Sequence, residues 1–192
     1  MKSAYDRAME RAGKLGKLSP DEMKKQEEER LLTIGRAIAD KYIVHGSTQV
    51  LKGDIDKLRA EDRDLVARGA RLGLVASLSF DRGVTLEAIE RMAAGLTSLA
   101  TDKKGAIDEM REKVKSLLEE MEAELDKTYS NEYGRLEGER RVLLQGLGIS
   151  GSAVAGVNVE GSSAWEQIEN ELRSRYNANL EPLKVKLSQA VA

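Results

Sequence analysis

The chain has 192 residues, of which 33% are charged and 4% aromatic, and its formal net charge is −2. Acidic and basic residues are interleaved, which argues against nucleic acid or an anionic membrane as the partner. The chain has no cysteine, so disulfides and thiolate metal sites lack their residues. Its one histidine, His45, is not expected to form a metal site or a Ser-His-Asp triad. No stretch is long and apolar enough to span a bilayer, and the charged N-terminal residues predict no signal peptide, so we expect a cytoplasmic protein.

The first part of the chain predicts a short arm and then a strong helix start. Residues 1–18 are expected to form a helical arm that docks either on its own chain or on a partner. The run Ser19-Pro20-Asp21-Glu22 is the pattern of a capping box with Pro at the first helical position. The helix that follows should stop at His45-Gly46. Its predicted buried residues are Met23, Leu31, Ile34, Ile38 and Tyr42.

A further helix is predicted to begin at Ser47. Its seam positions recur alternately at four and three residues, and Asp62 and Gly69 interrupt them. The apolar seam residues are Leu51, Ile55, Leu58, Leu65, Leu72 and Ala76. The spacing G-x-x-x-G occurs at 69–73 and again at 134–138, among Arg and Glu residues that do not suit a membrane. Each pair indicates either a close helix contact or a local softening of a helix.

The longest apolar seam lies in the middle of the chain. A turn at Phe80–Val84 and a capping Thr85 predict a helix, and a seam with coiled-coil spacing then follows from Ile107. Because this seam resumes in phase after 101–105, we expect one continuous helix of about 60 residues, about 90 Å long. The predicted seam residues are Ile107, Met110, Val114, Leu117, Met121, Leu125, Leu136 and Leu143.

The pattern changes in residues 146–161, which contain five glycines and no basic residue. This segment is expected to form a β-hairpin or an Ω-loop. Residues 146–151 match G-x-G-x-x-G, but no strand is predicted before them and no helix start until Ser163, so a structural turn is favoured over a nucleotide site. The run Ser163–Glu166 predicts a second capping box, and Pro182 is expected to kink or restart the last helix.

The candidate partner-binding residues are Ile149, Val154, Val157, Val159 and Trp165. Either they form an exposed docking element, or the loop packs on neighbouring helices with Trp165 as its anchor. Glutamates at 119–124 predict a solvated face with ion pairs to lysines of the same helix rather than a metal site. We therefore expect no cofactor, no metal and no catalytic residue.

These patterns predict an all-α fold, a long antiparallel coiled-coil hairpin or helical bundle with a Gly-rich tip loop capable of forming a β-hairpin. One domain is expected, with an arm at 1–18, long helices at 19–145, the tip at 146–162 and a closing helix at 163–192. The outline is similar to that of prefoldin-type chaperone subunits, although the longer N-terminal half departs from it.

The expected function is that of a non-enzymatic helical interaction protein, an oligomeric scaffold, adaptor or chaperone-like factor. It would bind a second copy of itself and a protein partner through its helix faces and the 146–161 loop. The alternative is a small-ligand or nucleotide-binding helical protein that uses this loop and Trp165. A coiled coil associated with nucleic acid is disfavoured by the balanced charge.

Overall fold

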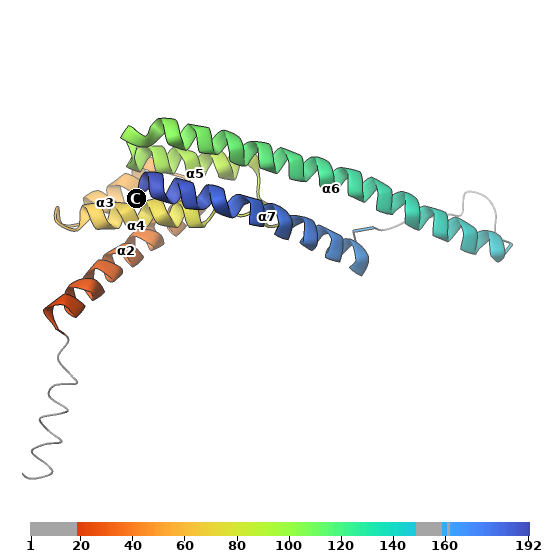
Figure 1. Ribbon diagram of the computed structural model, residues 1–192, viewed down its shortest axis with the longest axis horizontal. Helices are drawn as coiled ribbons and strands as arrows, with labels where there is room; N and C mark the ends of the chain where they lie inside the picture. Colours follow the sequence, from red (N-terminus) through yellow and green to blue (C-terminus); the bar gives the residue numbers. More distant parts are fainter. Residues whose placement is uncertain (1–18, 149–158, 161) are drawn as a thin grey trace, which may run out of the picture. The chain divides into compact units, whose positions relative to one another are not determined.

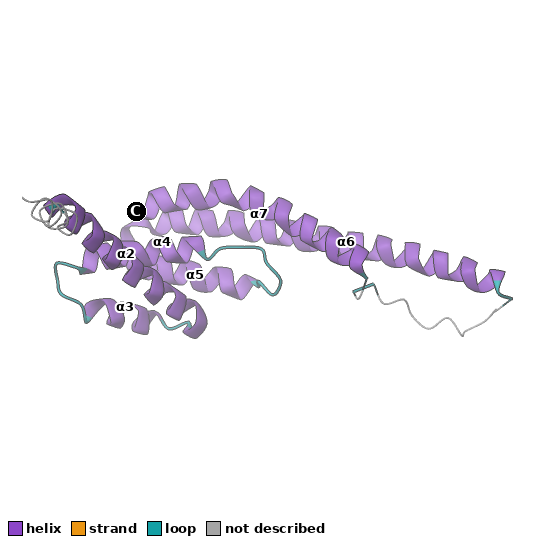
Figure 2. Ribbon diagram, turned by 90° about the horizontal axis from the view of Figure 1, so that it is seen from below, coloured by secondary structure: helices purple, strands orange, loops and turns teal. Residues whose placement is uncertain are grey.

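The computed structural model describes residues 19–148, 159–160 and 162–192 (Figure 1). Within these residues all regular structure is helical, as expected, and Figure 2 shows helices joined by loops and no strand. None of the described helices is long and apolar enough to cross a membrane. The contacts group the chain into two compact units, one of residues up to Leu74 together with Ala192 and one of Val75–Val191.

In the first unit, α2 spans Pro20–His45 and begins and ends where the sequence predicted. The Ser19 side chain accepts a hydrogen bond from the backbone N–H of Glu22, and the Glu22 carboxylate accepts one from Ser19 at 2.7 Å, which confirms the capping box. Gly46 ends the helix in the left-handed region, with φ 72°. The predicted burial of Met23 is wrong, because the helix packs only from Leu31 onward. Its buried residues are Leu31, Gly35, Ala39 and Tyr42.

The segment after Ser47 forms two helices instead of the expected one, namely α3 (Thr48–Asp56) and α4 (Arg63–Ala76). Ser47 caps α3 as predicted. The break between them is stabilised by Arg63, which donates hydrogen bonds to the carbonyl oxygens of Leu58 and Asp56. The predicted seam of α4 is also wrong, because Leu65 and Leu72 are only half-buried. The buried residues of α4 within this unit are Val66, Gly69, Ala70, Gly73 and Leu74.

The helices α2 and α4 touch through their backbones. A Cβ atom added at Gly35 would lie 2.2 Å from the carbonyl oxygen of Val66, and one added at Gly69 would lie 2.3 Å from that of Leu32. Of the two alternatives left open for 69–73, the structure therefore shows the close helix contact. A Cβ atom at Gly134 would meet nothing within 4 Å among the described residues, so the second G-x-x-x-G pair makes no such contact there.

The second unit contains α5 (Leu86–Leu99), the short 3-10 helix η1 (Thr101–Lys103), α6 (Lys104–Gly146) and α7 (Ser163–Val191). The expected continuous helix through 101–105 is wrong. The backbone turns at Ala100, with φ −144° and ψ 67°, and α5 packs against α6. The turn lets these two helices cover each other's apolar faces, which one straight helix would leave exposed. The helix α6 has 43 residues, which makes it about 65 Å long rather than 90 Å.

The helix α7 runs antiparallel to the first part of α6. Its start contacts Tyr129, and its middle contacts Glu124, which precedes Tyr129 on α6. The helix continues through Pro182, so the predicted restart is wrong. The predicted seam residues Ile107, Met110, Val114 and Met121 are buried. The prediction is wrong at Leu117, which is half-buried while Leu118 is buried. It is also wrong at Leu143, which is 65% exposed.

Candidate functional site

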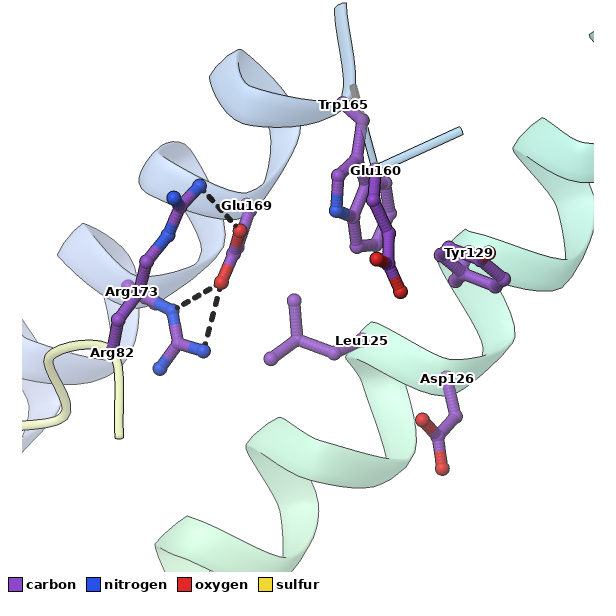
Figure 3. Close-up of a pocket in the computed structure, with 8 residues that line it drawn as sticks. All are labelled: Arg82, Leu125, Asp126, Tyr129, Glu160, Trp165, Glu169 and Arg173. Atoms are coloured by element: carbon purple, nitrogen blue, oxygen red, sulfur yellow. Dashed lines mark hydrogen bonds and ion pairs between the residues drawn. The ribbon is translucent and has the colours of Figure 1, made fainter. Parts of the chain in front are cut away.

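An open groove of about 670 Å³ lies between α6 and α7 where α7 begins (Figure 3). Its lining residues come from α6, from α7, from Glu160 just before α7, and from the loop that precedes α5. The groove thus joins residues that are far apart in the sequence. The lining residues are Arg82, Leu125, Asp126, Tyr129, Glu160, Trp165, Glu169 and Arg173.

The start of α7 positions Trp165. The Ser162 hydroxyl accepts a hydrogen bond from the Trp165 backbone N–H at 3.1 Å and donates one to the Val159 carbonyl oxygen at 2.8 Å. Ser162 is therefore the capping residue, and the capping box predicted at Ser163 is wrong by one position. The Trp165 ring meets Tyr129 edge to face, with centroids 5.2 Å apart and planes at 86°. This aromatic pair anchors the start of α7 on α6.

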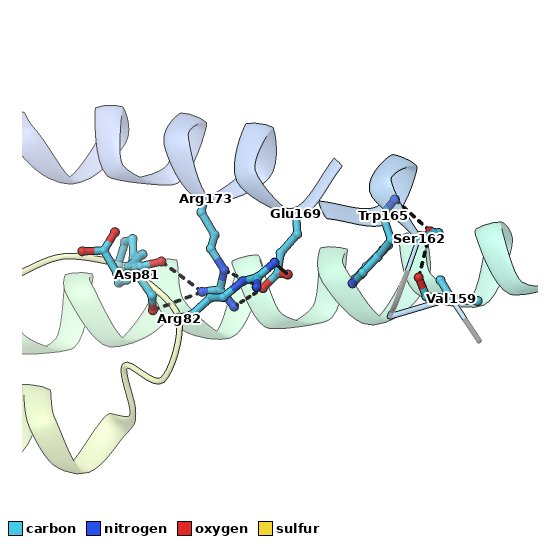
Figure 4. A network of polar contacts seen from close by, with 8 residues as sticks. Asp81, Arg82, Val159, Ser162, Trp165, Glu169 and Arg173 are labelled. Carbon is cyan, nitrogen blue, oxygen red and sulfur yellow. Dashed lines mark hydrogen bonds and ion pairs between the residues drawn. The ribbon is translucent and has the colours of Figure 1, made fainter. Parts of the chain in front are cut away.

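A cluster of charged groups forms one end of the groove (Figure 4). The largely buried carboxylate of Glu169 accepts hydrogen bonds from Arg82 at 2.6 Å and from Arg173 Nε at 2.9 Å. Arg173 Nη1 also donates to the carbonyl oxygens of Phe80 and Asp81, at 3.0 and 3.2 Å. Glu169 and Arg173 thereby fasten the loop before α5 to α7.

Asn177 completes this attachment one turn further along α7. Its side-chain oxygen accepts a hydrogen bond from the backbone N–H of Phe80 at 2.7 Å. Phe80 is itself fully buried, at 1% exposure. A buried backbone N–H needs an acceptor, and in this loop a side chain from α7 supplies it.

The other end of the groove carries two carboxylates of a different kind. Asp126 lies on α6 about one turn before Tyr129, and Glu160 lies just before α7. Neither side chain has a hydrogen-bond or ion-pair partner among the described residues. In Figure 3 the Glu160 carboxylate points toward the space beside Tyr129 and Trp165. The negative charge at this end is thus uncompensated by the described chain.

The neighbouring acidic stretch of α6 behaves differently. Glu124 accepts a hydrogen bond from the Tyr176 hydroxyl at 3.0 Å and forms an ion pair with Arg175 at 2.5 Å. The hydrogen bond from Arg175 is the main reason why the pKa of Glu124 is lowered. The ion-pair partner of Glu124 is therefore on α7, whereas the sequence analysis expected a lysine of the same helix. Glu119, Glu120 and Glu122 are exposed, as a solvated face predicts.

Beyond the groove, α6 continues past the start of α7 for more than four turns. We call residues 132–147 the α6 overhang. Three large apolar side chains of this segment are exposed: Val142 at 70%, Leu143 at 65% and Leu147 at 67%. The described part of the chain does not cover them, so the overhang presents an apolar surface next to ion-paired arginines and glutamates.

The predicted partner-binding residues fall into two groups, those outside the described residues and those that are buried. Ile149, Val154 and Val157 are outside the described residues, together with most of the 146–161 loop. Val159 and Trp165 are both buried, at 0% and 8% exposure, although Trp165 also lines the groove. Their burial favours the anchor interpretation for these two positions. The role of the other three stays a prediction.

The structure describes little that suits a nucleotide or a metal. Gly146 is the last residue of α6, so a helix stands where the G-x-G-x-x-G mechanism requires a strand. No group of three or more acidic or histidine side chains is arranged to hold a metal ion within the described ranges. The single histidine, His45, is the exposed last residue of α2.

Most of the groove residues were not predicted from the sequence. The spacing of Glu169 and Arg173, i and i+4, is a local signal for an ion pair. The three-residue spacing of Asp126 and Tyr129 also places them on one helix face. No such signal exists for Arg82, which is 87 residues from its partner Glu169.

Comparison with protein-family models, with curated proteins and with solved structures finds no match to this chain. Function is therefore inferred from the residues and contacts of the chain itself.

Proposed function

We propose that this chain is a non-enzymatic helical interaction protein, an oligomeric scaffold, adaptor or chaperone-like factor. The observation that carries the proposal is the α6 overhang, on which Val142, Leu143 and Leu147 are exposed. Large apolar side chains gathered on one surface are typical of protein contact sites. The proposed contacts are with a second copy of the chain and with a protein partner.

The proposal includes a coiled-coil hairpin of α6 and α7 with the 146–161 segment at its tip. Four buried residues of α6 support it, because Ile107, Met110, Val114 and Met121 keep heptad spacing, and Leu118 departs from it by one position. The corresponding residues of α7 recur at four and seven. On this view the hairpin holds the overhang and the tip away from the packed part of the second unit. The buried apolar and aromatic residues are Ile107, Met110, Val114, Leu118 and Met121 on α6 and Trp165, Leu172, Tyr176, Leu180, Leu187 and Val191 on α7.

The overhang variant Val142→Ser/Leu143→Ser tests the proposal against the control Val185→Ser. Val185 is also an exposed valine, at 54%, and it lies on α7, which packs along α6. Sedimentation velocity over a wide concentration range should show self-association of the wild type and of the control, and weaker association of the overhang variant. Crosslinking and mass spectrometry from native extract should locate partner crosslinks on the overhang, and these should be lost in that variant alone.

Two results would count against this function. One is a wild-type chain that remains monomeric at every concentration and yields no specific crosslinks to another protein. The other is an overhang variant that associates and crosslinks just as the control does. Circular dichroism of all three proteins must show the same helix content, so that a loss of binding is not a loss of folding.

A second candidate is a helical protein that binds a small ligand or a nucleotide. The groove favours it, because about 670 Å³ is within the range of ligand pockets and Trp165 lies in its wall. Since Trp165 is the single tryptophan of the chain, its fluorescence reports directly on this groove. Saturable quenching by a nucleotide or an acyl cofactor would support this candidate, and a flat titration would remove its basis.

A further inference from the structure

The positive groups in the groove are already engaged. Arg173 donates to Glu169 and to the carbonyl oxygens of Phe80 and Asp81. Arg82 shares the same Glu169 carboxylate. Arg173 therefore already binds the loop before α5, and its guanidinium is poorly placed to bind an anionic ligand.

The negative groups at the other end are not engaged. Asp126 and Glu160 have no partner among the described residues. Three carboxylates and two guanidiniums line the groove, so its formal charge is −1, and the excess negative charge lies at the Asp126 end. Both side chains are exposed, and in Figure 3 the Glu160 carboxylate lies beside the aromatic pair whereas the Asp126 carboxylate points away from it. A cationic group beside the aromatic pair would therefore be attracted mainly by Glu160, and by Asp126 from a greater distance.

The aromatic pair lies at the same end. Tyr129 is partly exposed, and Trp165 meets it edge to face. The face of an aromatic ring attracts ammonium and guanidinium groups, because its quadrupole is negative above and below the ring plane. Carboxylates beside an aromatic surface therefore suit a cation that also carries an alkyl chain, as lysine and arginine side chains do.

We propose that this end of the groove receives a lysine or arginine side chain of the protein partner. The inference rests on the proposed function and names the chemistry of the partner. The groove is open to solvent, and α6 leads from Tyr129 to the exposed Val142, about 20 Å away along the helix. The partner segment would thus place a basic residue in the groove and apolar residues about 20 Å further along α6.

The test uses the full chain and a fluorescein-labelled hexa-arginine peptide. Anisotropy of the label measures binding, and emission of Trp165 reports whether the peptide reaches the groove. Asp126→Asn/Glu160→Gln is compared with Glu119→Gln/Glu122→Gln, which removes the same charge from exposed positions of α6. We expect the groove variant to weaken binding by about tenfold, which is what two modest ionic contacts contribute together. The control variant should bind within about twofold of wild type.

Three outcomes would overturn the inference: no binding of hexa-arginine, equal weakening in both variants, or equally tight binding of hexaglutamate. Spermidine tests whether the ligand is a free amine rather than a side chain. If this small polycation displaced the peptide at equal concentration, the ligand would be a free amine and the inference would be overturned. Failure here leaves the proposed function intact if the overhang variant still loses its association. If the overhang variant associates as its control does while the peptide still binds, the proposed function is refuted instead.

Discussion

The two units pack their helices in different ways. In the first unit α2 and α4 touch at Gly35 and Gly69, where an added Cβ atom would lie 2.2–2.3 Å from a carbonyl oxygen of the other helix. In the second unit α6 and α7 meet through side chains, such as the rings of Tyr129 and Trp165, and they bury large residues such as Met121 and Leu180. Backbone contact leaves no space to be rearranged, whereas a side-chain interface can relax in part when one member is truncated. The first interface should therefore be the more sensitive to a single added methyl group.

Adding a methyl group at the α2–α4 contact should produce the largest effect. Gly35→Ala places a Cβ atom against backbone atoms of α4 that cannot turn away, so we expect a loss of about 3 kcal/mol, at the upper end for overpacked cores. Urea unfolding followed by circular dichroism measures the loss, and hydrogen exchange should show faster exchange in α2 and α4.

Gly134→Ala is the matched control, because its Cβ atom would meet nothing within 4 Å. In an exposed helix interior this change should stabilise the protein by up to about 1 kcal/mol. Equal stabilities of the two variants would contradict the backbone contact between α2 and α4.

In the second unit the corresponding test is truncation of the α6 seam. Leu118→Ala removes a side chain that is 2% exposed and should cost about 3 kcal/mol, whereas Leu117→Ala should cost roughly half as much. Urea unfolding followed by Trp165 fluorescence reports on this unit. A larger loss for Leu117→Ala would restore the seam that the sequence analysis expected.

The side-chain contacts of α7 with the loop before α5 should contribute less. Asn177→Ala leaves the buried N–H of Phe80 without its acceptor, which should cost about 1–2 kcal/mol. Asn179→Ala, at an exposed position of the same helix, should be close to neutral. The exchange rate of the Phe80 amide proton provides a direct second measurement, and it should rise only in Asn177→Ala.

The smallest effect concerns acid stability of the first unit. Hydrogen bonds from Lys41 and then Lys57 lower the pKa of Asp54 from 3.8 to about 2. Because the folded-state pKa is the lower one, this contribution to stability is present above about 3.8 and is lost as the pH falls toward 2. Asp54→Asn should lack this part of the acid dependence, and Asp56→Asn should retain it.

Carbon NMR of the Asp54 carboxyl group measures the pKa directly. Lys41→Met should raise it toward 3.8, since Lys41 is the larger cause of the shift. An unchanged pKa in Lys41→Met would show that this contact between α2 and α3 is absent in solution.

Local signals in the sequence were reliable guides to helix ends. The caps at Ser19, Ser47 and Thr85 and the stop at Gly46 were predicted correctly, because each depends on hydrogen bonds between residues two to four positions apart. The capping residue of α7 was wrong by one position, because Ser162 and Ser163 are adjacent and chemically identical.

Periodicity was less reliable within the helices. It placed Leu117 rather than Leu118 in the seam of α6, because Leu117 keeps the alternating three- and four-residue spacing of a heptad, whereas the buried Leu118 lies one position beyond it. It also predicted helices that run through 57–62 and through Ala100, since a heptad pattern that stays in phase looks the same whether the chain runs straight or folds back. The contacts that decide between these alternatives are made with other helices.

The sequence by itself determined the all-α class, most helix starts and the absence of cysteine chemistry. Only the tertiary structure decided that α5 packs on α6, that Gly35 and Gly69 touch the backbone of another helix, and that Arg82 and Arg173 meet at Glu169. The physical reason is range. Caps and helical periodicity depend on residues within one or two turns, whereas the groove depends on pairs separated by tens of residues, whose meeting is set by the packing of whole helices.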